Sequence, residues 1–159
     1  MPYGTIPAMA ITLEFLMNVA ADVGELMTMG GGPLGERRVV AIDGGTFAGP
    51  QLRGTIVPGG ADWQIARADG VLDIDARYAL RTDAGALIRV VSQGYRHGPP
   101  EVLAALGRGE DVPREKYFFR TVMRFETGAA DLQWLNRTIA IATAQRKARQ
   151  VLLEAYRLL

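Results

Sequence analysis

Glycine and proline are concentrated between residues 44 and 64, and this concentration constrains the fold more than any other feature of the chain. The segment contains Gly44-Gly45, Gly49-Pro50, Gly54 and Pro58-Gly59-Gly60 and ends in Asp62-Trp63-Gln64. Both residue types weaken helices, whereas this spacing is typical of short strands that curl or bulge. The segment therefore predicts extended chain arranged around one Asp-Trp pair.

The chain after this segment continues as strands. In residues 71–82 apolar side chains alternate with charged ones, which predicts a strand with one apolar and one charged face. Asp83-Ala84-Gly85 is a turn signal, and residues 86–93 return antiparallel to the first strand. The same reasoning predicts strands at 11–19, 37–43, 52–57, 62–67, 117–126 and 136–143, with turns at 58–60 and 69–70.

Two segments have helical character. Pro99-Pro100 before residues 101–106 and Gly107 after them predict a short helix, which is a candidate lid or plug. Residues 144–159 also have helical apolar spacing, but a barrel needs a closing strand, so we assign 151–157 to a strand. The prediction is an all-β fold, mainly an antiparallel, lipocalin- or calycin-like β-barrel with one or two short helices, forming a single domain over residues 1–159.

The composition argues against several classes of function. The net charge of +1 is too small for a nucleic-acid-binding surface, and no apolar segment approaches the roughly 20 residues of a membrane span. The chain has no cysteine and one histidine, His97, for which we expect a surface position; this argues against a zinc centre or a Ser-His-Asp triad. We expect no metal, no cofactor, no nucleic-acid partner and no membrane insertion, and a cytoplasmic location.

Motifs along most of the chain resemble one family. They are Gly44-Gly45-Thr46-Phe47, Pro58-Gly59-Gly60-Ala61-Asp62-Trp63, Arg77-Tyr78, Phe125-Glu126-Thr127-Gly128 and Trp134-Leu135-Asn136. Together they are similar to the domain-of-unknown-function family 3237, also called uncharacterised-protein family 0311. The resemblance implies a compact antiparallel barrel with a pocket at one end, often paired as a homodimer. Ala48 and Ala84 stand where acidic residues are common in the family, so roles of those acids do not transfer.

Polar residues among the apolar strands are the candidate site. We expect Asp62 or Glu126 to transfer a proton, and Arg77 and Arg120 to stabilise an oxyanion. The expected ligand-binding residues are Trp63, Asp75, Tyr78, Tyr117, Trp134 and Asn136. The alternatives are structural: Asp62 caps a turn, Asp75 and Arg77 face water, the aromatic rings fill the core, and Asn136 bonds to a neighbouring loop.

These residues lead to three functional hypotheses. The first is a cofactor-independent lyase, isomerase or cyclase that acts by proton transfer on a small carbonyl-bearing molecule, aromatic or polyketide-like. The second is a non-catalytic barrel that carries or senses a small hydrophobic ligand. The third is a structural dimerisation module, in which strand faces meet a partner and leave no ligand-sized cavity.

Overall fold

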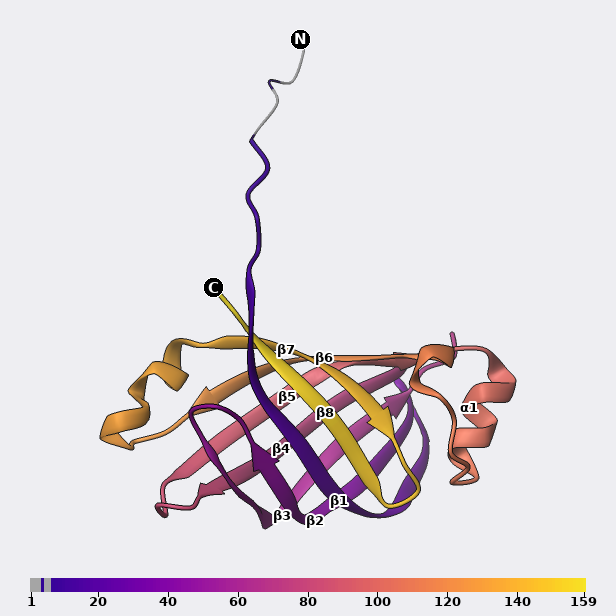
Figure 1. Cartoon of the computed structure of the whole chain (residues 1–159). Coiled ribbons are helices and arrows are strands. Elements are labelled where there is room, and N and C mark those ends of the chain that lie inside the picture. Colours follow the sequence, from indigo (N-terminus) through magenta and orange to yellow (C-terminus); the bar gives the residue numbers. More distant parts are fainter. Residues whose placement is uncertain (1–3, 5–6) are drawn as a thin grey trace.

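In the part of the chain that the structure describes, eight antiparallel strands form a closed barrel in which each strand pairs with its neighbours in the sequence and the last pairs with the first. The computed structural model describes residue 4 and residues 7–159 (Figure 1). The strands are β1 (Leu13–Gly32), β2 (Gly35–Ala48), β3 (Arg53–Ala66), β4 (Leu72–Thr82), β5 (Leu87–His97), β6 (Phe118–Glu126), β7 (Ile139–Arg146) and β8 (Gln150–Leu158). The predicted antiparallel barrel with short helices is confirmed.

The C-terminal segment is a strand despite its helical spacing. β8 pairs with β1 from Leu13↔Leu158 to Asp22↔Gln150, and with β7 on its other edge. Barrel closure satisfies the backbone groups of both edge strands, and this gain exceeds the weak local preference for a helix. The assignment of residues 151–157 to a strand is therefore confirmed.

Several predicted boundaries were wrong because glycine pairs bend strands here without ending them. The two strands predicted at 52–57 and 62–67 are parts of one strand, β3, which spans residues 53–66, and the expected turn at 58–60 is a bulge with a register shift against β4. Gly44 and Gly45, at φ of 149° and 126°, lie in a similar irregularity of β2, where the register shifts against β1 and β3. Strand β1 likewise runs past residue 19 to Gly32. Continuous bulged strands curve more strongly, which suits a small barrel.

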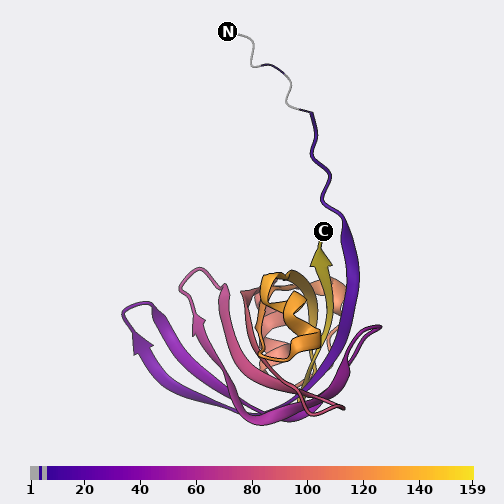
Figure 2. The ribbon, with the colours of Figure 1, turned by 90° about the vertical axis from the view of Figure 1, so that its left-hand side faces the viewer.

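Short helical segments lie at opposite ends of the barrel. Helix α1 (Pro100–Gly107) and the 3₁₀ turn η1 (Arg114–Lys116) connect β5 to β6 at one end. A second 3₁₀ segment, η2 (Ala130–Arg137), connects β6 to β7 at the other end. The strand predicted at 136–143 is confirmed from Ile139 onward as part of β7, whereas residues 136 and 137 belong to η2. Figure 1 shows α1 on the right and η2 on the left, and Figure 2 shows η2 in front of the barrel end.

The barrel interior is mostly apolar, and the expected alternation holds. Every second residue of β4 from Leu72 to Leu80 is buried, and the same is true of β6 from Phe119 to Phe125. The largest fully buried side chains are Phe47, Met17, Leu80, Ile88, Met123, Leu135, Val19 and Val90. No helix in the described part of the chain has the length and apolar character of a membrane span.

Candidate functional site

An interior cavity of about 50 Å³ lies in the half of the barrel nearer α1. We call it the inner cavity. Its walls are mainly apolar side chains of β1, β2, β4, β6 and β8, with seven polar or charged residues among them. They are Asp62, Gln64, Tyr78, Arg96, Arg146, and Ser92 with Thr121, to which the Ser92 hydroxyl donates a hydrogen bond.

Asp62 is the carboxylate of the inner cavity. It is partly buried on β3, between Val40 of β2 and Ala76 of β4. One carboxylate oxygen accepts the backbone N–H of Asp75 at 2.9 Å, and the other accepts the side-chain amide of Gln64 at 2.7 Å. Burial raises the pKa of Asp62, although these two hydrogen bonds and the charge of Arg96 oppose the shift. A carboxyl group in such surroundings is suited to exchanging a proton with a bound molecule.

The local sequence explains why Asp62 points inward next to Tyr78. A Cβ atom at Gly60 would lie only 2.6 Å from the Cβ of Tyr78, so glycine lets β3 pass close to β4 at Tyr78. Two residues later the alternation of β3 brings Asp62 to the same interior face. The Gly59-Gly60-Ala61-Asp62 sequence therefore combines a bulge with an inward carboxylate.

Buried polar atoms without partners gather at this cavity. Among the described residues, five side-chain atoms are buried with no hydrogen-bond partner, and three of them, the Tyr78 hydroxyl, Gln64 Oε1 and Arg96 Nε, belong to residues that line this cavity. The other two are Arg38 Nε, whose residue lies opposite Gln64 on β2, and Arg157 Nε. Each such atom costs on the order of 1–3 kcal/mol if nothing satisfies it. Burial also raises the pKa of Tyr78 above its usual range, so its hydroxyl stays protonated and able to donate. This concentration of polar atoms without partners is typical of a ligand site.

Two arginines flank the carboxylate without pairing with it. Arg96 is the last inward-facing residue of β5, and Arg146 is the last inward-facing residue of β7. The Tyr117 hydroxyl accepts the backbone N–H of Arg146 at 2.9 Å. Neither guanidinium forms an ion pair or hydrogen bond with any residue that the structure describes. Burial, with the charge of Arg146, lowers the pKa of Arg96 to about 10, so it remains a cation at neutral pH.

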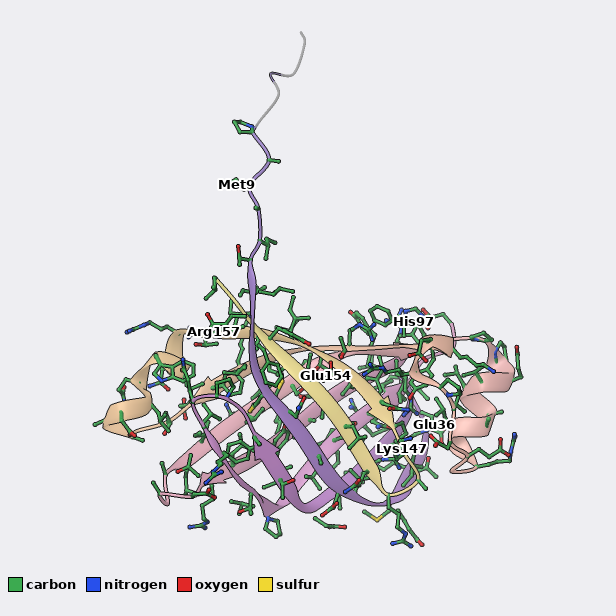
Figure 3. All side chains as sticks on the ribbon, viewed as in Figure 1. Met9, Glu36, His97, Lys147, Glu154 and Arg157 are labelled. Carbon is green, nitrogen blue, oxygen red and sulfur yellow. The ribbon has the colours of Figure 1, made fainter. Side chains whose placement is uncertain are left out.

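A larger hollow of about 380 Å³ adjoins the inner cavity at the end of the barrel where α1 lies. We call it the mouth. It shares Val40, Gln64, Arg96 and Arg146 with the inner cavity, and α1 contributes Leu103, Ala104, Leu106 and Gly107 to its wall. His97 and Lys147, which follow Arg96 and Arg146 in the chain, mark this end in Figure 3. The predicted helix thus lies where a lid would lie.

The structure separates the predicted site residues into two groups. Asp62 and Tyr78 line the inner cavity. Arg77 and Asp75 instead face outward and pair with each other at 3.1 Å, so the expectation that Arg77 points inward was wrong. They alternate with the inward residues of β4, and the side chain of Arg77 is 52% exposed.

The other predicted residues also lie outside the inner cavity. Trp63, Asp75 and Arg120 line a groove of about 760 Å³ on the outer wall, and Glu126 is exposed at the end of β6. Tyr117 is buried at the base of β6. Half-buried Trp134 stacks under Arg157 at 5.3 Å, and Asn136 holds the Thr127 backbone through bonds of 2.7 and 2.9 Å. His97 is exposed, which agrees with its predicted surface position, and its ring stacks on that of Phe118.

Sequence reasoning missed Arg96, Arg146, Arg38 and Gln64. The signal was present, because Ile88, Val90, Ser92 and Arg96 fall on one face of β5, and Ala140, Ala142, Ala144 and Arg146 on one face of β7. Following the apolar face of each strand to its last residue would have found both arginines. The described residues contain no group of three His, Asp or Glu side chains able to hold a metal ion.

Comparison with known proteins identifies one family that covers nearly the whole chain. The model of the family described as "Protein of unknown function (DUF3237)" matches residues 11–158. A UPF0311 protein of Bradyrhizobium diazoefficiens is 37% identical over 92% of this chain and 95% of its own length. A UPF0311 protein of Rhodopseudomonas palustris is 37% identical over 95% of this chain and its whole length.

Solved structures agree with the fold. A protein of unknown function from Rhodopseudomonas palustris matches with a TM-score of 0.92 at 35% identity, over 96% of this chain and 100% of that one. A beta-barrel like protein from Acinetobacter baumannii matches with a TM-score of 0.84 at 41% identity, over 98% and 100%. A structure described as an enzyme from Penicillium herquei matches with a TM-score of 0.74 at 22% identity, over 99% and 100%, a likeness of fold alone.

Proposed function

The chain belongs to the DUF3237 family, and we propose that it is a cofactor-independent enzyme that moves a proton on a small carbonyl-bearing molecule bound in the barrel. Lyases, isomerases and cyclases all use such a step. That a barrel of this fold is described as an enzyme in Penicillium herquei is consistent with the proposal, although at 22% identity it carries no reaction over.

The observation that carries the proposal is the position of Asp62. Its carboxylate lines the inner cavity, burial raises its pKa, and no ion pair among the described residues neutralises it. A structural carboxylate at this depth is normally paired with a cation. Asp62 instead forms no ion pair or hydrogen bond with a guanidinium among the described residues, although Arg96 lines the same cavity and its charge acts to lower the pKa of Asp62.

Each polar residue then has a role in the proton transfer. Asp62 takes a proton from a carbon next to the carbonyl of the bound molecule and returns it at a second position. The Tyr78 hydroxyl and the Arg96 guanidinium donate hydrogen bonds to the oxygen that becomes negative during this step. Gln64 and the Asp75 backbone N–H hold the carboxylate in place. The apolar walls exclude water and strengthen these interactions.

Proton exchange tests this chemistry without knowledge of the natural substrate. Acetophenone, phenylacetone and 4-phenylbutan-2-one are incubated in D₂O with the wild-type protein, and loss of the α-proton signal is followed by NMR. We expect exchange above the buffer rate for at least one ketone, and a loss of at least about 100-fold in the Asp62→Asn variant. Asp73→Asn, which removes an outward carboxylate of β4, is the matched control and should keep the wild-type rate.

Equal exchange by wild-type protein and Asp62→Asn would remove Asp62 from the mechanism. Binding of a ketone without exchange above the buffer rate would favour the non-catalytic carrier, which uses the same cavity but needs no proton-transfer group.

A further inference from the structure

We infer that the natural ligand of this barrel is an organic acid, whose carboxylate binds between Arg96 and Arg146 while its apolar body lies in the mouth against α1. The inference deepens the proposed function and rests on it for the role of the ligand as substrate. The binding itself is a separate claim and is tested separately.

The two guanidiniums lie at the junction of the two hollows. Arg96 and Arg146 are the charged residues that line both the inner cavity and the mouth. Neither guanidinium has an ion-pair or hydrogen-bond partner among the described residues, and Arg96, which lies over the Phe119 ring, has a buried Nε without such a partner. Arg38, on the mouth side, is already paired with Glu36 at 2.9 Å. A ligand passing from the mouth to the inner cavity must therefore pass two unpaired cations.

The charges around the junction do not balance. Four arginines and one carboxylate, Asp62, line the two hollows. Glu36 pairs with Arg38, and Asp69 and Asp73 pair with Arg67, which leaves Arg96 and Arg146 without an ion-pair partner among the described residues. Arg146 and Arg96 repel each other, which contributes to the lowered pKa of Arg96. An anion between two partly desolvated guanidiniums removes this repulsion and supplies the missing acceptors.

The surroundings favour a singly charged carboxylate over a phosphate. Asp62 shares the inner cavity, so an ionised Asp62 repels a second negative charge more strongly as that charge increases. The part of α1 that lines the mouth is its C-terminal half, residues 103–107, where the helix dipole is unfavourable to anions. The carboxylate is therefore expected at the arginines rather than beside the helix.

The mouth fits the apolar remainder of such a molecule. Leu26, Leu72, Leu103 and Leu106 line it, and its volume of about 380 Å³ is within the range of small-molecule sites. The inner cavity, at about 50 Å³, has room for only a few atoms. The reacting group can enter the inner cavity while the apolar part of the ligand stays in the mouth. Arg96 and Arg146, which line both hollows, would then fix the orientation of the ligand.

Matched acids and amides test the charge requirement directly. Binding of cinnamate and phenylacetate to the wild-type protein is measured by calorimetry and thermal shift beside cinnamamide and phenylacetamide, which have the same shape without charge. We expect the acids to bind at least about tenfold more tightly than the amides, with an affinity that falls as salt is added. Amides that bind as well as the acids would overturn the inference, and so would phenyl phosphate binding more tightly than both acids.

Variants then locate the carboxylate. Arg96→Gln and Arg146→Gln should each weaken cinnamate binding by about tenfold or more, whereas Arg89→Gln, an outward arginine of β5, should not. Arg96→Lys keeps the charge and should recover part of the affinity, which separates charge from loss of folding. Cinnamate binding unchanged in both glutamine variants would overturn the site.

The Asp62→Asn variant separates this inference from the proposed function. It should bind cinnamate at least as tightly as wild type, because a like charge is removed, even though proton exchange is lost. Proton exchange that is retained in Asp62→Asn would contradict the proposed mechanism but not the inference that the barrel binds an acid. A wild-type protein that exchanges ketone protons but does not bind the acids would contradict the inference but not the mechanism.

Discussion

The two halves of the barrel interior are built from the same eight strands but differ in chemistry. The half near η2 contains Met17, Phe47, Leu80, Ile88 and Met123, all of them at most 2% exposed. The half near α1 contains a carboxylate, unpaired guanidiniums and a phenol hydroxyl without a partner among the described residues. Along β5 the change occurs within one row, from Ile88 and Val90 through Ser92 to Arg96.

This difference separates the apolar packing that stabilises the barrel from the proposed functional site. Closely packed apolar side chains contribute most of the free energy of folding, so the η2 half holds the barrel closed. Buried polar groups without partners cost free energy, and they persist where a ligand requires them. The rigid half therefore supports a polar half that would not be stable alone.

The largest expected effect comes from a cavity made in the apolar half. Leu80 is fully buried, and Leu80→Ala should lower the free energy of unfolding by about 3 kcal/mol, because the closely packed neighbours cannot collapse into the space. Leu72→Ala, on the same strand beside the mouth, should cost less, because Leu72 already borders a hollow. Equal losses in denaturant titrations would show that the two halves are packed alike.

Removing a buried charge from the polar half should have the opposite sign. Arg96→Met replaces a mostly desolvated guanidinium with an apolar side chain of similar length and keeps a contact with the Phe119 ring. We expect the free energy of unfolding to rise by about 1 kcal/mol. Arg89→Met, exposed on the outer wall, is the control and should leave it unchanged. A loss of stability in Arg96→Met alone would indicate that Arg96 holds the barrel together.

A smaller effect with a defined pH dependence is expected for Asp62→Asn. The pKa of Asp62 is raised in the folded protein from an ordinary value of 3.8, so its stabilising contribution is complete below that value and is lost as the pH rises through the folded pKa. An asparagine cannot ionise, and its amide can donate to Gln64 Oε1, which now has no partner among the described residues. The variant should gain stability relative to wild type as the pH rises from 3.5 to 8.

Denaturant midpoints of both proteins across that pH range measure this difference. An advantage of Asp62→Asn that is largest at low pH would mean that the folded-state pKa of Asp62 is lowered, as in a structural ion pair. The general acid–base role would then lose its physical basis.

The fold could be predicted from sequence because strand alternation is a local signal that barrel closure reinforces. Residues 71–82 and 117–126 alternate without interruption, and the structure places them in β4 and β6. Glycine pairs were misinterpreted because the same residues mark turns and bulges, and only pairing across strands separates the two. The helical spacing of residues 144–159 was correctly overruled by the need for a closing strand.

The site was harder to predict because the strand register decides which side chains point into the barrel and which of them meet there. Asp62 was found through its motif, and Tyr78 through the apolar face of β4. Arg77 was expected in the interior because a guanidinium can stabilise an oxyanion. It is, however, the neighbour of the inward Tyr78 on β4, and strand alternation therefore predicts that it faces outward. Arg96 and Arg146 are far apart in sequence and meet only because β5 and β7 end at the same rim as α1.

The smallest effect is expected on the outer wall, at Arg77. Its guanidinium forms bonds of 3.1 and 3.2 Å to Asp75, but the side chain is 52% exposed, so water replaces the lost pairing. Arg77→Gln should leave the unfolding midpoint, the ketone exchange rate and cinnamate affinity at wild-type values. Loss of exchange with unchanged stability would restore Arg77 to the site and would require a ligand that reaches across the barrel wall. Because Arg77 and Arg96 lie on adjacent strands with opposite facing, their two variants separate the effect of arginine chemistry from that of position.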